Sequence, residues 1–162
     1  MLFRSNVEYC NYLRQYDNKV PYNFGEKVNR PYVGVLFDVD DCSYFAPLSS
    51  PKPKHLTMKN KMDFLKIDDG KLGAINFNNM LPVKDQNVVK IDLNKNLSNE
   101  YDIKYNNMLK RQIYWLNRHH EKLYDKSRKL YYNYKEDKLP YNIKVRCCNF
   151  PLLEEKCHEY NK

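Results

Sequence analysis

The chain has 162 residues, a formal net charge of +8 and a pI of about 9.1. A hydrophobic content of 42% excludes a generally disordered chain, and the length suits one domain over residues 1–162 rather than two independent cores. No stretch approaches about 18 consecutive apolar residues, and the N-terminus turns polar too early for a secretory signal peptide. We therefore expect a soluble, cytoplasmic protein that does not associate with a membrane.

The chain begins with a short apolar element at residues 2–4, followed by a predicted helix over Val7–Tyr16. Ser5 or Asn6 can cap this helix, because both side chains accept hydrogen bonds from the first free amides of a helix. Residues 21–31 form a loop bounded by two prolines.

The next seventy residues read as short strands. Tyr32–Val39 is the clearest strand, because it is rich in β-branched and aromatic residues, and a turn at Asp40 and Asp41 follows it. The chain then returns over residues 43–48, where Pro47 predicts an end, a bulge or an edge position. Turn signals recur at short intervals, and we expect further strands at residues 62–67, 72–77, 80–83 and 88–93. This spacing favours a compact, strongly twisted antiparallel sheet or a partly open barrel.

From residue 99 onward the pattern becomes helical. Residues 99–137 contain neither Gly nor Pro and carry apolar residues at helical spacing, which predicts a long C-terminal helical region. The apolar stripe weakens near His119 and His120, so we expect two helices or a bend there. A last strand is expected over Ile143–Cys147 and a final helix over Leu152–Tyr160, with a proline in its first turn. The whole pattern predicts an α+β fold with flanking helices.

The five cysteines do not form a metal-binding pattern. They lie at positions 10, 42, 147, 148 and 157 without a CxxC pair, and Cys157-His158 lacks a second well-spaced pair of ligands. We expect reduced thiols, no metal and no cofactor. The absence of an HExxH or P-loop motif also argues against the common metal-hydrolase and nucleotide-hydrolase classes.

Basic residues concentrate in two tracts. Residues 104–135 contain nine Lys or Arg against two acidic residues, and residues 46–61 contain four Lys, one His and no acid. Codon bias and an ordinary solvated surface are alternative explanations for this composition. The interleaved Tyr and His favour a nucleic-acid groove, because cations contact phosphates and aromatic rings stack on bases.

The densest group of reactive side chains follows directly on a predicted strand, at Ser49-Ser50-Pro51-Lys52-Pro53-Lys54-His55. The prolines restrict the backbone and would hold the two hydroxyls and Lys52 in place. Hydroxyls can orient a phosphate, and a Lys can neutralise the charge that develops on it. The group therefore suits phosphoryl chemistry without a metal, although an ordinary proline-stiffened loop is an alternative.

Several segments resemble the ToxN/AbiQ family, the protein toxins of type III toxin–antitoxin systems, and they follow one another along the chain in the family's order. The segments are YLRQYDNKVP at residues 12–21, YVGV at 32–35, APLSSPK at 46–52, LGAINF at 72–77, NMLPV at 79–83, YNNMLKRQ at 105–112 and NFPLLEEK at 149–156. Together they cover nearly the whole chain.

The resemblance implies a metal-independent endoribonuclease with a Kid/MazF-like, twisted antiparallel sheet. It implies inhibition by a small structured antitoxin RNA, a pseudoknot-like repeat that the toxin itself processes. It further implies a cyclic assembly with equal numbers of protein and RNA chains, two or three of each, and a role in phage defence by abortive infection.

The family's site residues carry over unevenly. Its hydroxyls and cation match Ser49, Ser50 and Lys52, and its basic residue before the long strand matches Arg30. The family's loop tyrosine has no clear match, and Tyr22 is the nearest tyrosine before Arg30. We expect the remaining RNA contacts from a group of basic and aromatic side chains: Lys54, His55, Lys19, Tyr22, Lys110, Arg111 and Arg118.

The expected reaction is attack of the RNA 2′-OH on the adjacent phosphorus, which leaves 2′,3′-cyclic phosphate and 5′-OH ends. Lys52 would stabilise the charge on the phosphate, Ser50 and Ser49 would position it or relay a proton, and Arg30 would act as a second cation. A purely RNA-binding protein without catalysis is the alternative, since the basic tracts predict binding in both cases.

Overall fold

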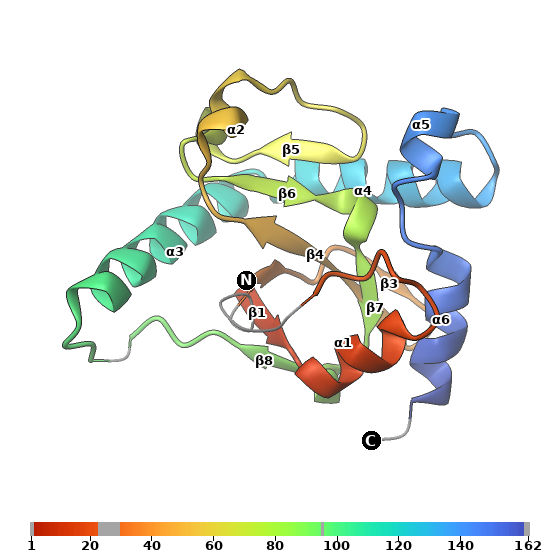
Figure 1. Cartoon of the computed structure of the whole chain (residues 1–162), viewed down its shortest axis with the longest axis horizontal. Helices are drawn as coiled ribbons and strands as arrows, with labels where there is room; N and C mark the ends of the chain where they lie inside the picture. Colours follow the sequence, from red (N-terminus) through yellow and green to blue (C-terminus); the bar gives the residue numbers. More distant parts are fainter. Residues whose placement is uncertain (1, 23–29, 95, 161–162) are drawn as a thin grey trace.

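The sheet is organised around one long strand, β4 (Cys42–Ser49), in the computed structural model, which describes residues 2–22, 30–94 and 96–160 (Figure 1). The strands of the described ranges pair in the order β5-β6-β4-β2-β1-β8, with β3 and β7 also paired to β4, and all pairs are antiparallel. Because this path ends at β5 and β8, the sheet is not closed. The remaining strands are β1 (Leu2–Ser5), β2 (Tyr32–Val33), β3 (Asp38–Val39), β5 (Phe64–Lys66), β6 (Ala74–Asn76), β7 (Leu81–Val83) and β8 (Val88–Lys90).

The strand predicted over residues 32–39 pairs with β4, but it is divided into two short strands, β2 and β3. Val33 lies opposite Ala46, and Asp38 lies opposite Ser43. The five steps from Val33 to Asp38 therefore run beside only three steps of β4. The extra residues form a bulge at Gly34, where an added Cβ would lie 2.1 Å from the Phe45 ring. The pattern of β-branched residues predicted the pairing, but it carried no signal for the bulge.

Pro47 neither ends its strand nor marks an edge, two of the three positions that the sequence predicted, because β4 continues to Ser49 and is paired on both sides. The Leu48 amide donates to the Pro31 carbonyl on the β2 side (2.9 Å), so the nitrogen of Pro47 faces the opposite side. On that side the 3-10 helix η3 (Phe77–Asn79) separates β6 from β7 and interrupts the pairing. The missing N–H of Pro47 therefore falls where the ladder has a gap.

The helices confirm most of the predicted helical pattern. Helix α1 is capped by Asn6, whose side chain accepts from the Glu8 amide (2.8 Å), and the long C-terminal region breaks into two helices at His119. The α-helices are α1 (Val7–Arg14), α2 (Pro53–Thr57), α3 (Glu100–Arg118), α4 (His120–Lys135), α5 (Tyr141–Lys144) and α6 (Phe150–Glu159), and the remaining 3-10 helices are η2 (Asp68–Gly70) and η4 (Asp85–Asn87).

The strand predicted over residues 143–147 is wrong. Pro140 caps a helical turn, α5, and the Val145 amide donates to the Tyr141 carbonyl (3.0 Å). The short alternation of apolar and basic residues resembled a strand, but the segment forms helical hydrogen bonds instead. The predicted strand at 62–67 is shortened to β5, since Ile67 already precedes the 3-10 turn η2.

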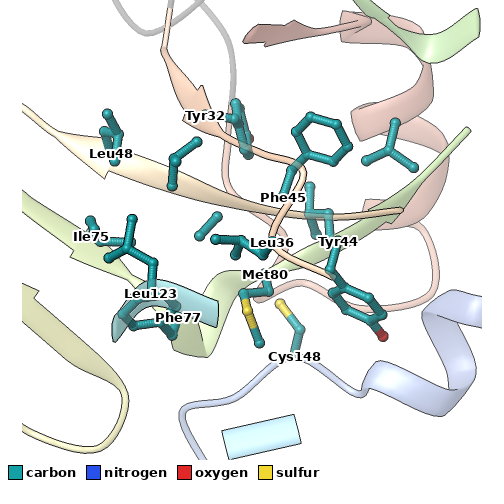
Figure 2. Close-up of a cluster of buried hydrophobic side chains, with 14 of the residues drawn as sticks. Tyr32, Leu36, Tyr44, Phe45, Leu48, Ile75, Phe77, Met80, Leu123 and Cys148 are labelled. Atoms are coloured by element: carbon teal, nitrogen blue, oxygen red, sulfur yellow. The ribbon is translucent and has the colours of Figure 1, made fainter. Parts of the chain in front are cut away.

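The core lies between the sheet and its helices, with buried residues from α1, α3, α4 and α6. Figure 2 shows Tyr44 and Leu48 of β4 in one cluster with Ile75, Phe77 and Met80, which Leu123 and Cys148 also reach, while Phe45 lies on the side of Tyr32. Tyr44 stacks on Phe37 with ring centroids 4.7 Å apart. All five cysteines are buried as reduced thiols. No helix in the described ranges is long and apolar enough to cross a membrane.

Candidate active site

The SSPK segment (Ser49–Lys52) leaves the carboxyl end of β4, in the middle of the sheet, with α2 following it (Figure 1). On one side the Leu48 amide donates to the Pro31 carbonyl, next to β2. On the other side Leu48 lies opposite Ile75, and Ser49 lies opposite Ala74 of β6. The first hydroxyl of the segment is therefore held between two neighbouring segments of the sheet.

The Ser49 hydroxyl has one defined partner. Asn76, at the end of β6, donates from Nδ2 to Ser49 Oγ over 2.8 Å. A hydroxyl has one proton to donate and two lone pairs to accept with. Because Asn76 occupies an acceptor position, the Ser49 proton is available to donate to another group, such as a phosphate oxygen.

A glycine allows the turn before β6 to approach the SSPK segment closely. Gly73 has a φ of +97°, and an added Cβ would lie 2.0 Å from the Ser49 carbonyl oxygen. Only glycine combines this left-handed backbone with so short a distance. The backbone of the turn thus fixes the position of Ser49.

Ser50 and Lys52 are exposed, and the backbone after them is stiff. Lys52 is the residue before the first turn of α2, where Pro53 begins the helix and the His55 amide donates to the Lys52 carbonyl (2.9 Å). None of the ion pairs among the described residues involves Lys52 or Lys54. Their ammonium groups are therefore not neutralised by a described carboxylate.

Arg30 lies beside the end of β4. Tyr32 is opposite Pro47, and the Pro31 carbonyl accepts a hydrogen bond from the Leu48 amide. Continuing this register by one residue would place Arg30 opposite Ser49. Residues opposite each other in an antiparallel pair project to the same face of the sheet. The pairing thus brings the predicted second cation next to the SSPK segment, and the Arg30 side chain is half-buried.

His55 differs from the other predicted RNA contacts, because its side chain is only 2% exposed. It packs on Phe64 with ring centroids 6.0 Å apart, and its Nδ1 is buried without a hydrogen-bond partner. Burial, together with the nearby ammonium groups of Lys54 and Lys52, lowers the pKa of His55. The geometry makes His55 an anchor of α2, and its contact with RNA stays a prediction.

Lys19 and Tyr22 have defined partners within the fold. The Lys19 ammonium donates to the Cys147 carbonyl (2.8 Å), so it helps to join the segment after α1 to the one before α6. Tyr22 is 49% exposed, and the guanidinium of Arg14 lies 4.2 Å from its ring centre. Sequence reasoning missed Arg14, since nothing in its helix pattern points to an aromatic partner.

The three predicted contacts on α3 are exposed along a helix that packs beside the site. The buried Gln112 donates from Nε2 to the Leu72 carbonyl (2.7 Å), next to Gly73, and ties α3 to the turn that fixes Ser49. Lys110 and Arg111 precede this residue and face solvent. Arg118 donates to the Tyr114 hydroxyl over 2.8 Å.

Asn76 is the site residue that sequence reasoning missed entirely. It lies in a segment that was predicted as a strand, but no sequence signal placed its amide beside Ser49. That placement depends on the β4–β6 register, in which Leu48 lies opposite Ile75.

Comparison with known proteins gives a consistent family. The family model described as "Toxin ToxN, type III toxin-antitoxin system" matches residues 1–158. The chain is 34% identical over 161 residues to Endoribonuclease ToxN of Bacillus thuringiensis subsp. kurstaki, which covers 97% of this chain and 82% of the relative. It is 30% identical over 172 residues to Endoribonuclease AbiQ of Lactococcus lactis subsp. lactis, which covers 99% of this chain and 88% of the relative.

Solved structures agree with the sequence relatives. One, described as "A processed non-coding RNA regulates a bacterial antiviral system", has a TM-score of 0.82 at 27% identity and covers 99% of both chains. Another, described as "New insights into the mechanism of bacterial Type III toxin-antitoxin systems: selective toxin inhibition by a non-coding RNA pseudoknot", has a TM-score of 0.81 at 32% identity and covers 98% of this chain and 96% of the other. The chain therefore belongs to the ToxN/AbiQ family of type III toxin–antitoxin toxins.

Proposed function

We propose that this protein is an endoribonuclease, the toxin of a type III toxin–antitoxin system, and that it cuts single-stranded RNA at the SSPK segment. The observation that carries the proposal is the end of β4, where exposed Ser50 and Lys52 follow a Ser49 hydroxyl oriented by Asn76. The relatives named above as endoribonucleases support it. Residues 1–162 would form one toxin domain that acts in the cytoplasm.

The proposed reaction uses the nucleophile that RNA carries. The 2′-OH loses its proton, its oxygen bonds to the adjacent phosphorus, and the bond from phosphorus to the 5′ oxygen breaks. The leaving oxygen takes up a proton, so the products are a 2′,3′-cyclic phosphate and a 5′-OH end. The protein must align the two oxygens and stabilise the negative charge on the pentacovalent phosphorus.

Each side chain has a role that its geometry allows. The Lys52 ammonium would neutralise charge on the non-bridging oxygens, with Arg30 as the second cation. Ser50 and Ser49 would position the phosphate by donating hydrogen bonds to its oxygens, and Asn76 leaves the Ser49 O–H free for this. No residue is assigned as the general base or the general acid.

The group of possible metal ligands among the described residues lies away from the SSPK segment. Among the described residues, one group of three or more His, Cys, Asp or Glu side chains could hold an ion, and it includes Cys42. Cys42 is the first residue of β4 and Ser49 is the last, so about 23 Å of strand separates them. In the proposed mechanism, Lys52 and Arg30 stabilise the charge at the phosphate.

The proposed inhibitor is a small structured RNA that this toxin processes and then retains. One solved relative is described as inhibited by a non-coding RNA pseudoknot. A groove that accepts phosphates can bind a folded RNA without any new protein feature, and the processed ends would stay near Ser50 and Lys52. If the two ends of one RNA lie on two chains, the links run head to tail and can close into a ring of two or three copies of each.

The proposed biological role is phage defence by abortive infection. The solved relatives described as part of an antiviral system, and as a lactococcal anti-phage endoribonuclease, support this role. The likeness of the sheet to that of the Kid/MazF toxins is also a proposal. It is supported by the open antiparallel sheet with helices around it.

Expression in bacteria without antitoxin RNA tests the proposed function. The wild-type chain should arrest growth, and Ser50→Ala should relieve the arrest at equal protein levels. Ser98→Ala, an exposed serine outside the site, is the matched control and should remain toxic. A fully toxic Ser50→Ala variant would refute the site. A non-toxic wild-type chain that still binds RNA would favour the alternative, an RNA-binding protein without catalysis.

A further inference from the structure

The fold brings together two dipeptides that lie 115 residues apart in the sequence. Asp41-Cys42 forms the turn into β4, and Cys157-His158 lies in the last turn of α6. Oδ1 of Asp41, Sγ of Cys42 and Nδ1 of His158 all lie within 4.8 Å of one another. Sequence spacing could not reveal this group, because neither dipeptide has a second ligand pair near it along the chain.

The distances within this group suit a tetrahedral ion after small movements. His158 Nδ1 lies 2.7 Å from Asp41 Oδ1, and Cys42 Sγ lies 3.8 Å from the same oxygen. Ligand atoms around a zinc ion are about 3.3–3.8 Å apart, given bond lengths of about 2.0–2.3 Å.

Lys84 orients the group from outside. Its ammonium lies 3.3 Å from Asp41 Oδ2 and 3.5 Å from the carbonyl of His158. The carboxylate oxygen that faces Cys42 and His158 is therefore the other one, Oδ1. A partner that holds the outer atom of a ligand is the usual way in which proteins orient a metal-binding side chain.

We propose that Asp41, Cys42 and His158 form a binding site for a thiophilic divalent cation such as Zn²⁺. A thiol, an imidazole and a carboxylate are the donors that zinc prefers, whereas Mg²⁺ and Ca²⁺ take oxygen ligands. Binding displaces the Cys42 proton to solvent, the ion replaces the contact between His158 Nδ1 and Asp41 Oδ1, and a water completes the coordination. The ion would join the β3–β4 turn to the end of α6, at the opposite end of β4 from the SSPK segment.

Cobalt is the probe that tests this site, because a Co²⁺–thiolate bond gives a charge-transfer absorption that oxygen and nitrogen ligands do not give. The full chain is purified under reducing conditions, stripped with EDTA and titrated with Co²⁺. We expect a thiolate band that saturates at one ion per chain and is displaced by Zn²⁺. Absence of the band would overturn the proposal.

Variants assign the ligands. Cys42→Ser should abolish the band, and Asp41→Asn and His158→Ala should each weaken cobalt binding by about tenfold or more. Asp40→Asn is the matched control, since Asp40 is the exposed neighbour of Asp41 and stands outside the group. A band that persists in Cys42→Ser, or an affinity unchanged in both other variants, would contradict the site.

The test does not require the fold to tolerate a change at the buried Cys42. The His158 side chain is 40% exposed, so the His158→Ala variant should fold. It is also independent of the proposed ribonuclease. If the site exists, Zn²⁺ should raise the unfolding temperature of the wild-type chain but not of His158→Ala. RNA cleavage should be the same with and without the ion.

Discussion

Asn76 is a positioning residue for Ser49, and its loss should slow RNA cleavage. With Asn76→Ala the Ser49 hydroxyl loses the donor that orients it (2.8 Å), and we expect the cleavage rate to fall about 2- to 10-fold, the equivalent of one hydrogen bond. Asn76→Asp should be slower still, because a carboxylate would accept the Ser49 proton and repel the phosphate. The rate is measured on a single-stranded RNA under single-turnover conditions.

The matched control is Asn78→Ala. Asn78 also donates a side-chain hydrogen bond, to the Arg146 carbonyl (3.2 Å), but it has no contact with Ser49. The Asn78→Ala variant should cleave the RNA at the wild-type rate. Equal rates for Asn76→Asp and Asn76→Ala would contradict the role given to the Ser49 proton.

His55 should make the stability of the fold depend on pH. Burial lowers the pKa of His55, so below its ordinary pKa of about 6.5 the unfolded chain takes up a proton that the folded chain resists. The free energy of unfolding should therefore fall as pH drops below that value, by at most about 1.4 kcal/mol per pH unit. Urea unfolding at several pH values measures this.

The variant His55→Phe keeps a ring against Phe64 but cannot take up a proton. The difference in unfolding free energy between wild type and variant should shrink or reverse toward acidic pH. A difference that is constant from pH 8 to pH 5 would show that the imidazole does not resist protonation.

At the residue scale, the sequence predicts side chains whose chemistry is concentrated along the chain. The prolines, hydroxyls and cations of residues 49–54 could be singled out because they are consecutive. Asn76 could not, since it reaches Ser49 only through strand pairing. The burial of His55 also could not be predicted, because Phe64, which packs against its ring, belongs to strand β5.

Helix α3 should contribute phosphate contacts that weaken with salt. Lys110 and Arg111 are exposed on the helix that Gln112 ties to the turn before β6. If both contact phosphates, replacing them together by Ala should reduce the slope of log affinity against log salt by about one to two units. Binding of a single-stranded RNA to a non-cleaving variant, measured between 50 and 200 mM salt, gives this slope.

The double variant Lys138→Ala, Lys144→Ala removes the same charge elsewhere. Both of these ammonium groups already pair with carboxylates, Lys138 with Glu136 and Lys144 with Asp137. Its salt slope should stay close to that of the wild type. Similar slopes for the two double variants would mean that α3 acts only through the overall charge.

At the element scale, periodicity predicted helices better than strands. Helices α3 and α4 repeat an apolar stripe over many turns, and their break at His119 was visible in the sequence. The strands other than β4 are only two to four residues long in the described ranges, which leaves little room for an alternating pattern. The helical turn α5 was mistaken for a strand because Pro140, three residues before Ile143, caps a helical turn and decides the local structure.

At the scale of the whole molecule, we expect an assembly that RNA holds together. Native mass measurement of the complex co-expressed with its antitoxin RNA should show equal numbers of protein and RNA chains, with two or three of each. The reason is geometric: an RNA whose ends lie on two different chains makes a head-to-tail link, and such links can close into a ring.

RNase treatment of this complex should release single protein chains with cleavage activity. A stable complex with an inhibitory protein and no RNA would contradict the assignment of the inhibitor.

The architecture at this scale could be predicted only as a class. An α+β chain with an antiparallel sheet followed from the turn spacing and the late helical region. The central position of β4 did not, because it depends on pairs such as Phe45 with Leu81 and Ser49 with Ala74. The meeting of Asp41-Cys42 with Cys157-His158 depends in the same way on where α6 packs.

The most direct test of the central claim is the chemistry of the cut ends, measured in excess EDTA. Purified wild-type protein is incubated with a single-stranded RNA, and the 3′ and 5′ ends of the products are identified. We predict 2′,3′-cyclic phosphate and 5′-OH ends, formed at the same rate with and without EDTA, and cleavage reduced at least about 100-fold in Ser50→Ala and in Lys52→Ala. Cleavage that stops in EDTA and returns with one added divalent ion, or that persists unchanged in Ser50→Ala, would contradict the account.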